Sequence, residues 1–187
     1  MSDEQQDLRE ALKKTAVALK EGGVGFALGG GYAAWALGGP EPEHDVDFVV
    51  AEDDAGRAEE VLSAAGLRVE HPPEDWLFKV FDGEAMADLI FRVNGRSVDR
   101  PLLERTQDVE VCSIAMPVLS ATDLVVTKML ALSEHACDLG KVLPSARALR
   151  EQVEWDAVRE QAAPHPFARA ALFLLEELEV APPAGSR

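Results

Sequence analysis

The chain has 187 residues, of which 47% are hydrophobic, enough to build the core of one domain or of a small domain with a helical appendage. Eighteen lysines and arginines stand against 34 aspartates and glutamates, so the net charge is −16. This excess disfavours nucleic acid as a partner, because binding to nucleic acid draws on the neutralisation of phosphates. It favours a cationic acceptor or a basic partner, and it also fits a role in solubility alone.

The cysteine content and the termini bear on localisation. Cys112 and Cys137 are the only cysteines, and their spacing is typical of neither a metal site nor a disulfide framework. No run approaches the roughly 18 apolar residues that span a bilayer. The acidic and polar residues 1–7 do not resemble a signal peptide. We therefore expect a cytoplasmic protein with no membrane partner.

The N-terminal part predicts alternating helices and strands. Apolar residues at helical spacing from Leu8 to Leu19 predict a first helix, which ends at Gly22 and Gly23. Residues 26–28 then form a short buried strand that leads into a glycine turn at residues 29–31. An apolar helix is expected over residues 32–37, stopped by glycine and proline.

A strand is predicted next over residues 44–50, which read HDVDFVV. Side chains alternate between the two faces of a strand, so Asp45 and Asp47 are expected to point to one side while Val46 and Phe48 point to a core. Two carboxylates held that close repel one another unless a cation lies between them. Hard oxygen ligands of this kind suit Mg²⁺, which usually completes its shell with water and substrate phosphates. The pattern therefore indicates metal-assisted phosphoryl chemistry.

Two apolar runs, residues 77–81 and 86–93, predict a β-hairpin. A two-residue turn with glycine in its first position sets a register in which Lys79 lies opposite Asp88. An aspartate in the middle of a strand is most often a structural residue with a salt-bridge partner, and Lys79 supplies one. The alternative is that Asp88 is a third functional carboxylate, which requires its strand to neighbour that of Asp45 and Asp47.

The second part of the chain is predicted to be helical. Short strands over residues 109–111 and 116–119 precede Ser120, which begins a capping box with Asp123 and a helix that contains Lys128. Further helices are expected at about residues 138–152, 155–161 and 167–178. We predict a catalytic core over residues 1–119, a C-terminal helical segment packed on it over residues 120–180, and a disordered tail over residues 181–187.

The glycine turn, the Asp-x-Asp strand and the later aspartate together resemble the minimal nucleotidyltransferases of the DNA polymerase β type. In that family an apolar strand, Gly-Gly or Gly-Ser, and a short helix are followed by Asp-x-Asp on the next strand and a third carboxylate on a later one. The region from Ser120 to Asp138 is similar to the helix that follows the catalytic sheet in bacterial relatives. Those relatives are the AbiEii-like toxins and the aminoglycoside and lincosamide nucleotidyltransferases.

This resemblance implies an α+β fold, with a mixed β-sheet core flanked by helices and a C-terminal helical segment. It implies an enzyme that moves a nucleoside monophosphate from an NTP to an acceptor hydroxyl and releases pyrophosphate, with two Mg²⁺ ions as cofactors. The acceptor would be a small molecule, or the RNA or protein target of a toxin–antitoxin system with a cognate antitoxin as partner. The implied catalytic and metal-binding residues are Asp45, Asp47 and Asp88, and the implied nucleotide-binding residues are Gly30, Gly31, His44, Lys79 and Lys128.

The chain also departs from the family pattern. Many relatives carry arginine, serine or threonine just before the first aspartate, whereas here His44 is the one residue able to replace it. Lys79, Arg92 and Lys128 are the candidate substitutes, although Lys128 also fits an ordinary exposed helix lysine. The alternative function is a catalytically degenerate nucleotidyltransferase fold that binds a nucleotide or a protein.

Overall fold

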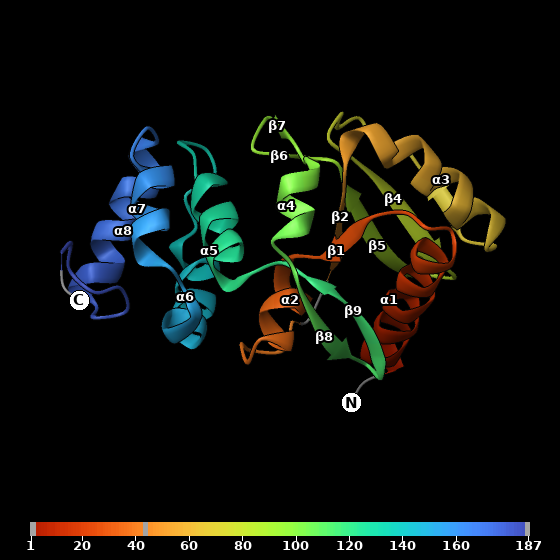
Figure 1. Ribbon diagram of the computed structural model, residues 1–187, viewed down its shortest axis with the longest axis horizontal. Helices are drawn as coiled ribbons and strands as arrows, with labels where there is room; N and C mark the ends of the chain where they lie inside the picture. Colours follow the sequence, from red (N-terminus) through yellow and green to blue (C-terminus); the bar gives the residue numbers. More distant parts are fainter. Residues whose placement is uncertain (1–2, 43–44, 186–187) are drawn as a thin grey trace. The chain divides into compact units, whose positions relative to one another are not determined.

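The computed structural model describes residues 3–42 and 45–185 (Figure 1). The chain divides into two compact units. The first, which we call the sheet unit, comprises residues 1–36 and 41–119, and the second, the helical unit, comprises residues 37–40 and 120–187. No helix among the described residues is both long enough and apolar enough to cross a membrane.

A seven-stranded sheet forms the centre of the sheet unit, in the order β3-β4-β5-β2-β1-β9-β8. The β2–β5 and β1–β9 pairs are parallel and the other pairs are antiparallel, which confirms the predicted mixed sheet. The strands are β1 (Phe26–Leu28), β2 (Val46–Val50), β3 (Arg68–Glu70), β4 (Leu77–Asp82), β5 (Ala85–Ile90), β8 (Gln107–Val111) and β9 (Ile114–Val118).

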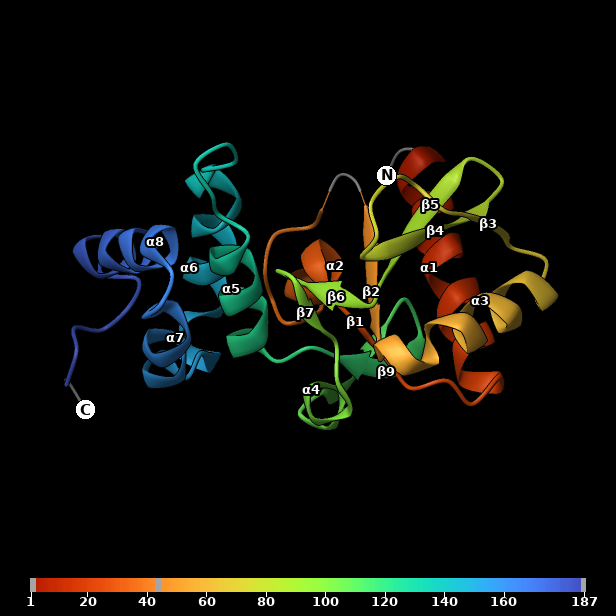
Figure 2. The ribbon, with the colours of Figure 1, turned by 90° about the horizontal axis from the view of Figure 1, so that it is seen from above.

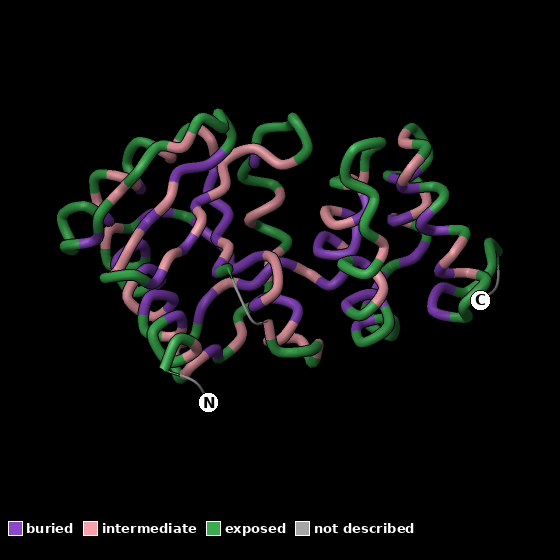
Figure 3. Tube along the Cα trace, turned by 180° about the vertical axis from the view of Figure 1, so that it is seen from behind, coloured by how far each residue is buried: buried purple, intermediate pink, exposed green. Residues whose placement is uncertain are grey.

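Helices α1 (Asp3–Glu21) and α3 (Ala55–Ala64) contact each other, and α1 packs against β5 (Figures 1 and 2). The sheet face with Phe48 and Leu89 is completely buried, whereas Met86 and Asp88 on the opposite face are partly exposed (Figure 3). Burial of one face removes its apolar side chains from water and stabilises the unit. Asp47 and Asp88 therefore lie on the more open face of the sheet.

The predicted strand over residues 86–93 is shorter in the structure, because β5 ends at Ile90. The carbonyl of Trp76 accepts hydrogen bonds from both Phe91 N (3.0 Å) and Arg92 N (3.2 Å), which interrupts the regular ladder. The chain then forms a separate two-stranded sheet and a short helix that sequence periodicity did not predict. These elements are β6 (Arg92–Val93), β7 (Arg96–Ser97) and α4 (Arg100–Glu104).

A carboxylate fastens this small sheet to the end of β2. Glu52 accepts hydrogen bonds from Arg92 Nε (2.8 Å) and from the Ser97 hydroxyl. These bonds hold the pKa of Glu52 below its ordinary value of 4.5. A lowered carboxyl pKa contributes stability that is present above the unfolded-state pKa and is lost as the pH falls through the folded-state pKa.

We expect Glu52→Gln to lower the melting temperature at about pH 7, and we expect this effect to shrink as the pH falls through the lowered pKa of Glu52. Thermal unfolding at a series of pH values, followed by circular dichroism, checks this. A difference in melting temperature between the two proteins that stays constant across the acid range would contradict it.

In the helical unit, helix α5 (Ala121–Leu130) begins at the predicted capping box. Ser120 Oγ accepts a hydrogen bond from Asp123 N (3.1 Å) and donates one to Asp123 Oδ2 (2.6 Å). The single helix expected at about residues 138–152 is instead three short pieces, because Pro144 lacks an N–H and lies in the first turn of a helix that starts only at Leu143. The pieces are η2 (Leu139–Lys141), α6 (Leu143–Leu149) and η3 (Arg150–Gln152).

The last helices, α7 (Trp155–Ala162) and α8 (Pro166–Glu177), lie close to their predicted bounds. The tail predicted to be disordered begins with packed residues. Ala181 is 2% exposed and donates a hydrogen bond from its backbone N to Leu175 O (3.0 Å), and Arg159 donates to Pro182 O. The expectation of disorder from residue 181 onward is therefore corrected at Ala181 and Pro182, because a small apolar residue next to α8 completes the core of the helical unit.

Candidate active site

The glycine turn joins β1 to α2 (Gly30–Ala36) and lies directly against Asp47. Gly29 N donates a hydrogen bond to Asp47 O (2.8 Å). Gly30 has a φ of +55°, and a Cβ atom at this position would lie 1.7 Å from Asp47 Oδ2. Gly31 is also crowded, though less so, since a Cβ there would lie 2.8 Å from Pro42 Cβ. Only glycine permits this close approach of the turn to the carboxylate.

Asp47 and Asp88 lie side by side. They are register partners in the parallel β2–β5 pair, so their side chains leave the same face of the sheet. The predicted hairpin register is also confirmed, because Lys79 lies opposite Asp88 and its Nζ is 2.8 Å from Asp88 Oδ1. The Asp88 side chain is 16% exposed and that of Lys79 is 28% exposed. The structure thus brings together two of the three predicted carboxylates with one predicted lysine.

Asp45 is not part of β2, which begins at Val46. Its φ of +57° is in the left-handed region, which aspartate tolerates better than most residues. The alternation of side chains along a strand therefore does not extend to Asp45. The prediction that Asp45 and Asp47 point to the same side of one strand is wrong. Pairing between β2 and β5 starts only at Val46 and Ala87, so no ladder holds Asp45 in an extended conformation.

Asp45 instead lines an acidic pocket of 440 Å³. The other carboxylates of this pocket are Glu4 and Asp7 from the first turns of α1 and Glu84 from the β4–β5 turn. Sequence reasoning missed these three residues, because nothing in the sequence indicates that the start of α1 lies beside the hairpin turn. The pocket is apolar on the side formed by Leu8, Ala85 and Met86.

Asp47, Asp88 and Asp45 are the carboxylates that could hold a metal ion. Asp47 and Asp88 provide hard oxygen donors on adjacent strands, as Mg²⁺ requires. Within residues 3–42 and 45–185, however, no three histidine, cysteine or acidic side chains are grouped closely enough to hold an ion. The donor set fits the cation chemically, and the participation of Asp45 in it stays a prediction.

Some of the predicted nucleotide-binding residues lie beside Asp47 and Asp88. Lys128 lies half-buried on α5 of the helical unit. His44 falls outside the described residues. Gly30 and Gly31 form the turn beside Asp47, and Lys79 lies beside Asp88.

Lys79 partly neutralises the Asp47–Asp88 pair, which leads to a prediction for Lys79→Met. Loss of the ammonium group leaves two carboxylates side by side, so we expect a lower melting temperature in EDTA. We also expect half-saturation at an Mg²⁺ concentration about fivefold lower, because removing an ion pair worth about 1 kcal/mol frees Asp88 for the cation. Thermal unfolding over an Mg²⁺ titration measures both quantities, and an unchanged Mg²⁺ midpoint would argue against a shared cation site.

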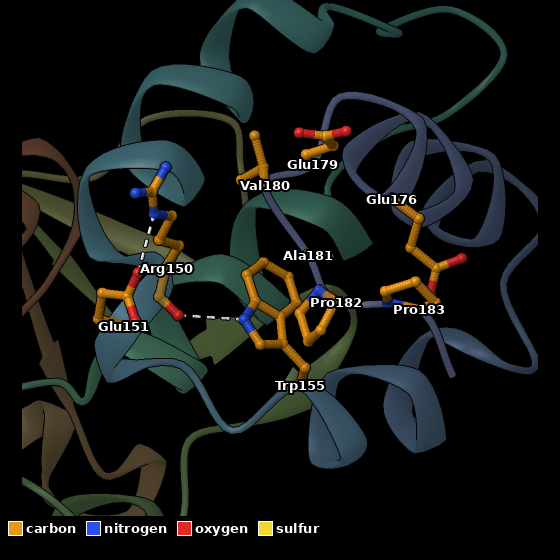
Figure 4. A pocket seen from close by; sticks show the side chains of 9 residues that line it. All are labelled: Arg150, Glu151, Trp155, Glu176, Glu179, Val180, Ala181, Pro182 and Pro183. Atoms are coloured by element: carbon orange, nitrogen blue, oxygen red, sulfur yellow. Dashed lines mark hydrogen bonds and ion pairs between the residues drawn. The ribbon is translucent and has the colours of Figure 1, made fainter. Parts of the chain in front are cut away.

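A pocket of the helical unit has a volume of 590 Å³ (Figure 4). Trp155 lies at its centre and donates its indole N–H to Arg150 O (3.1 Å). Residues 179–183 form one side of the pocket. It contains none of the predicted site residues.

Comparisons with solved structures identify the fold. The solution structure of the antibiotic-resistance factor ANT(2'')-Ia superposes with a TM-score of 0.62 at 16% identity, over 95% of this chain and 100% of that one. ANT(2'')-Ia in complex with adenylyl-2''-tobramycin gives 0.52 at 14% identity, over 91% and 98%. An antigenic nucleotidyltransferase-like protein from Paracoccidioides brasiliensis gives 0.51 at 13% identity, over 90% and 93%. The fold is therefore the nucleotidyltransferase fold.

Sequence comparison goes further than the fold. The chain belongs to the family described as "Uncharacterised nucleotidyltransferase", whose model matches residues 4–179. No curated protein matches the sequence. Membership of this family confirms the predicted minimal nucleotidyltransferase and a transferase activity that moves a nucleoside monophosphate.

Proposed function

We propose that the protein transfers a nucleoside monophosphate from an NTP to an acceptor hydroxyl, with release of pyrophosphate and dependence on Mg²⁺. The observation that carries this proposal is the placement of Asp47 and Asp88 on adjacent strands, directly beside a glycine turn that tolerates no side chain. Paired carboxylates able to hold Mg²⁺ are what metal-assisted phosphoryl transfer needs.

Each residue has a distinct role in this proposal. Asp45, Asp47 and Asp88 would hold Mg²⁺, which when bound neutralises charge on the triphosphate and activates the acceptor oxygen. Gly30 and Gly31, at the start of α2, are proposed to donate their backbone N–H groups to phosphate oxygens. Lys79 would neutralise phosphate charge as a point cation, and Lys128 and His44 are proposed for the same task.

The acidic pocket beside Asp45 supports a cationic small molecule as acceptor. The pocket has four carboxylates and, among the described residues that line it, no basic one, so it would attract ammonium groups. The net charge of −16 acts in the same direction over longer distances. One relative of similar fold was solved with adenylyl-2''-tobramycin, a nucleotidylated product. An RNA or protein target, with a cognate antitoxin as partner, is the other acceptor class that we propose to test.

The test is turnover of labelled NTP by the purified protein in the presence of Mg²⁺, with candidate acceptors of both classes. We expect pyrophosphate and a nucleotidylated product from the wild type, and neither from the double variant Asp45→Ala and Asp47→Ala. Circular dichroism of the variant establishes that it folds. Product formation that persists in the folded double variant would refute the proposed site.

A catalytically degenerate fold that only binds nucleotide is the second candidate. The ion pair between Lys79 and Asp88 favours it, because the lysine occupies an oxygen that a metal would otherwise use. A ligand that binds only the folded state raises the melting temperature, so titration with NTP and Mg²⁺ detects binding without chemistry. Stabilisation by both ligands without any release of pyrophosphate would favour this second function.

A further inference from the structure

Arg9 of α1 joins α1 to the segment that leads toward Asp45. Its Nη2 donates a hydrogen bond to a carboxylate oxygen of Glu41. Its guanidinium carbon lies 5.1 Å from the centroid of the Trp35 ring, so the group is also held by a cation–π contact. Trp35 in turn packs edge-on against Tyr32, with centroids 6.0 Å apart and planes at 88°. Three elements therefore meet at one guanidinium.

This cluster joins α1 and α2 and is buried only at Tyr32. Tyr32 is 0% exposed, and neither its hydroxyl nor Arg9 Nε has a hydrogen-bond partner within the described part of the chain. The Arg9 side chain is 25% exposed. The hydrogen bond to Glu41 raises the pKa of Arg9, and burial raises the pKa of Tyr32. Arg9 therefore remains a cation and Tyr32 remains neutral at physiological pH.

The segment held by Arg9 also touches the glycine turn. Pro42 follows Glu41 and lies so close to Gly31 that a Cβ on the glycine would meet Pro42 Cβ at 2.8 Å. Further along the chain, Asp45 lines a pocket together with Leu8, the residue that precedes Arg9. Glu41 and Asp45 thus both lie beside the same turn of α1, one through an ion pair and one through a shared pocket.

We propose that Arg9 is a positioning residue for the catalytic carboxylates: it holds Glu41 and Pro42 against the glycine turn and thereby sets where Asp45 lies relative to Asp47. It also neutralises Glu41, so that this acid does not compete with Asp45 for a cation. The inference depends on the proposed function only in assigning Asp45 and Asp47 to the metal.

The first test is amide hydrogen exchange of the metal-free protein, comparing Arg9→Met with the wild type. Methionine keeps an apolar stem over Trp35 and removes the guanidinium. We expect exchange in peptides that cover residues 41–47 to become roughly tenfold faster. Exchange in the remaining strands of the sheet unit is expected to stay unchanged. Lys14→Met is the matched control, because Lys14 lies on the same helix and pairs with Asp82 at 2.7 Å, away from this segment.

The second test is the Mg²⁺ requirement of NTP turnover. We expect Arg9→Met to need roughly tenfold more Mg²⁺ than the wild type for half-maximal rate, and Lys14→Met to need no more than the wild type. Arg9→Lys is expected to fall between them, since lysine keeps the charge without the planar guanidinium. The double variant Arg9→Glu with Glu41→Arg restores the pair in reverse, and it is expected to recover both readouts.

Two results would overturn the inference. One is unchanged exchange over residues 41–47 in Arg9→Met. The other is a uniform acceleration over the whole sheet unit that the reversed pair does not repair, which would make Arg9 a general stabilising residue. The exchange measurement requires no turnover. A wild type that releases no pyrophosphate would therefore refute the proposed function and leave the positioning role to be decided by exchange alone.

Discussion

Asp47→Asn is expected to reduce NTP turnover by about 10³-fold or more and, in the same protein, to remove most of the rise in melting temperature that Mg²⁺ gives the wild type. The rate falls because a neutral amide is a poor ligand for a cation that stabilises charge in the transition state. The response to Mg²⁺ falls because Asp47 and Asp88 are register partners on adjacent strands, and an amide in place of one carboxylate weakens the binding of a cation to the pair. A cation that binds the folded state less tightly stabilises it less.

Asp88→Asn is expected to lose activity to a similar extent but to be slightly destabilised, because it leaves Lys79 without its partner. Asp82→Asn is the matched control. Asp82 lies on the same hairpin and pairs with Lys14, so its replacement breaks an ion pair and should leave turnover unchanged. Pyrophosphate release, and thermal unfolding in EDTA and in Mg²⁺, give the required rates and melting temperatures. Asp47→Asn with wild-type turnover, or with the wild-type response to Mg²⁺, would contradict the prediction.

Gly30→Ala is expected to impair both stability and activity. Alanine at a φ of +55° costs about 1–3 kcal/mol through backbone strain alone. The added methyl group would also lie 1.7 Å from Asp47 Oδ2, so the carboxylate or the turn must move. We therefore expect a loss of stability greater than strain explains and a fall in turnover of about 10²-fold, as for other small displacements of catalytic groups.

Gly83→Ala separates the two causes. Gly83 has a similar φ of +62° in the β4–β5 turn, and a Cβ there meets nothing within 4 Å. The difference in free energy of unfolding between the two variants therefore measures the clash with Asp47. Urea unfolding and NTP turnover of both proteins check the prediction. Equal destabilisation in the two variants, with full turnover in Gly30→Ala, would show that the turn and the carboxylate are not coupled.

Features that depend on local interactions could be predicted from the sequence. The turn at Gly83 and Glu84 determined the hairpin register, so the pairing of Lys79 with Asp88 followed from counting residues outward from the turn. Ser120 at the start of α5 was predicted correctly for the same reason, since a cap is made by residues within one turn.

Only the tertiary structure decided how distant segments meet. The sequence by itself determined the mixed helix–strand composition, the glycine turn and the acidic residues available for chemistry. Neither the neighbouring position of Asp47 and Asp88, nor the left-handed conformation of Asp45, nor the contact of Arg9 with Glu41 follows from spacing. Each depends on which strands pair and where α1 packs, and these are set by burial of apolar side chains from the whole unit rather than by neighbouring residues.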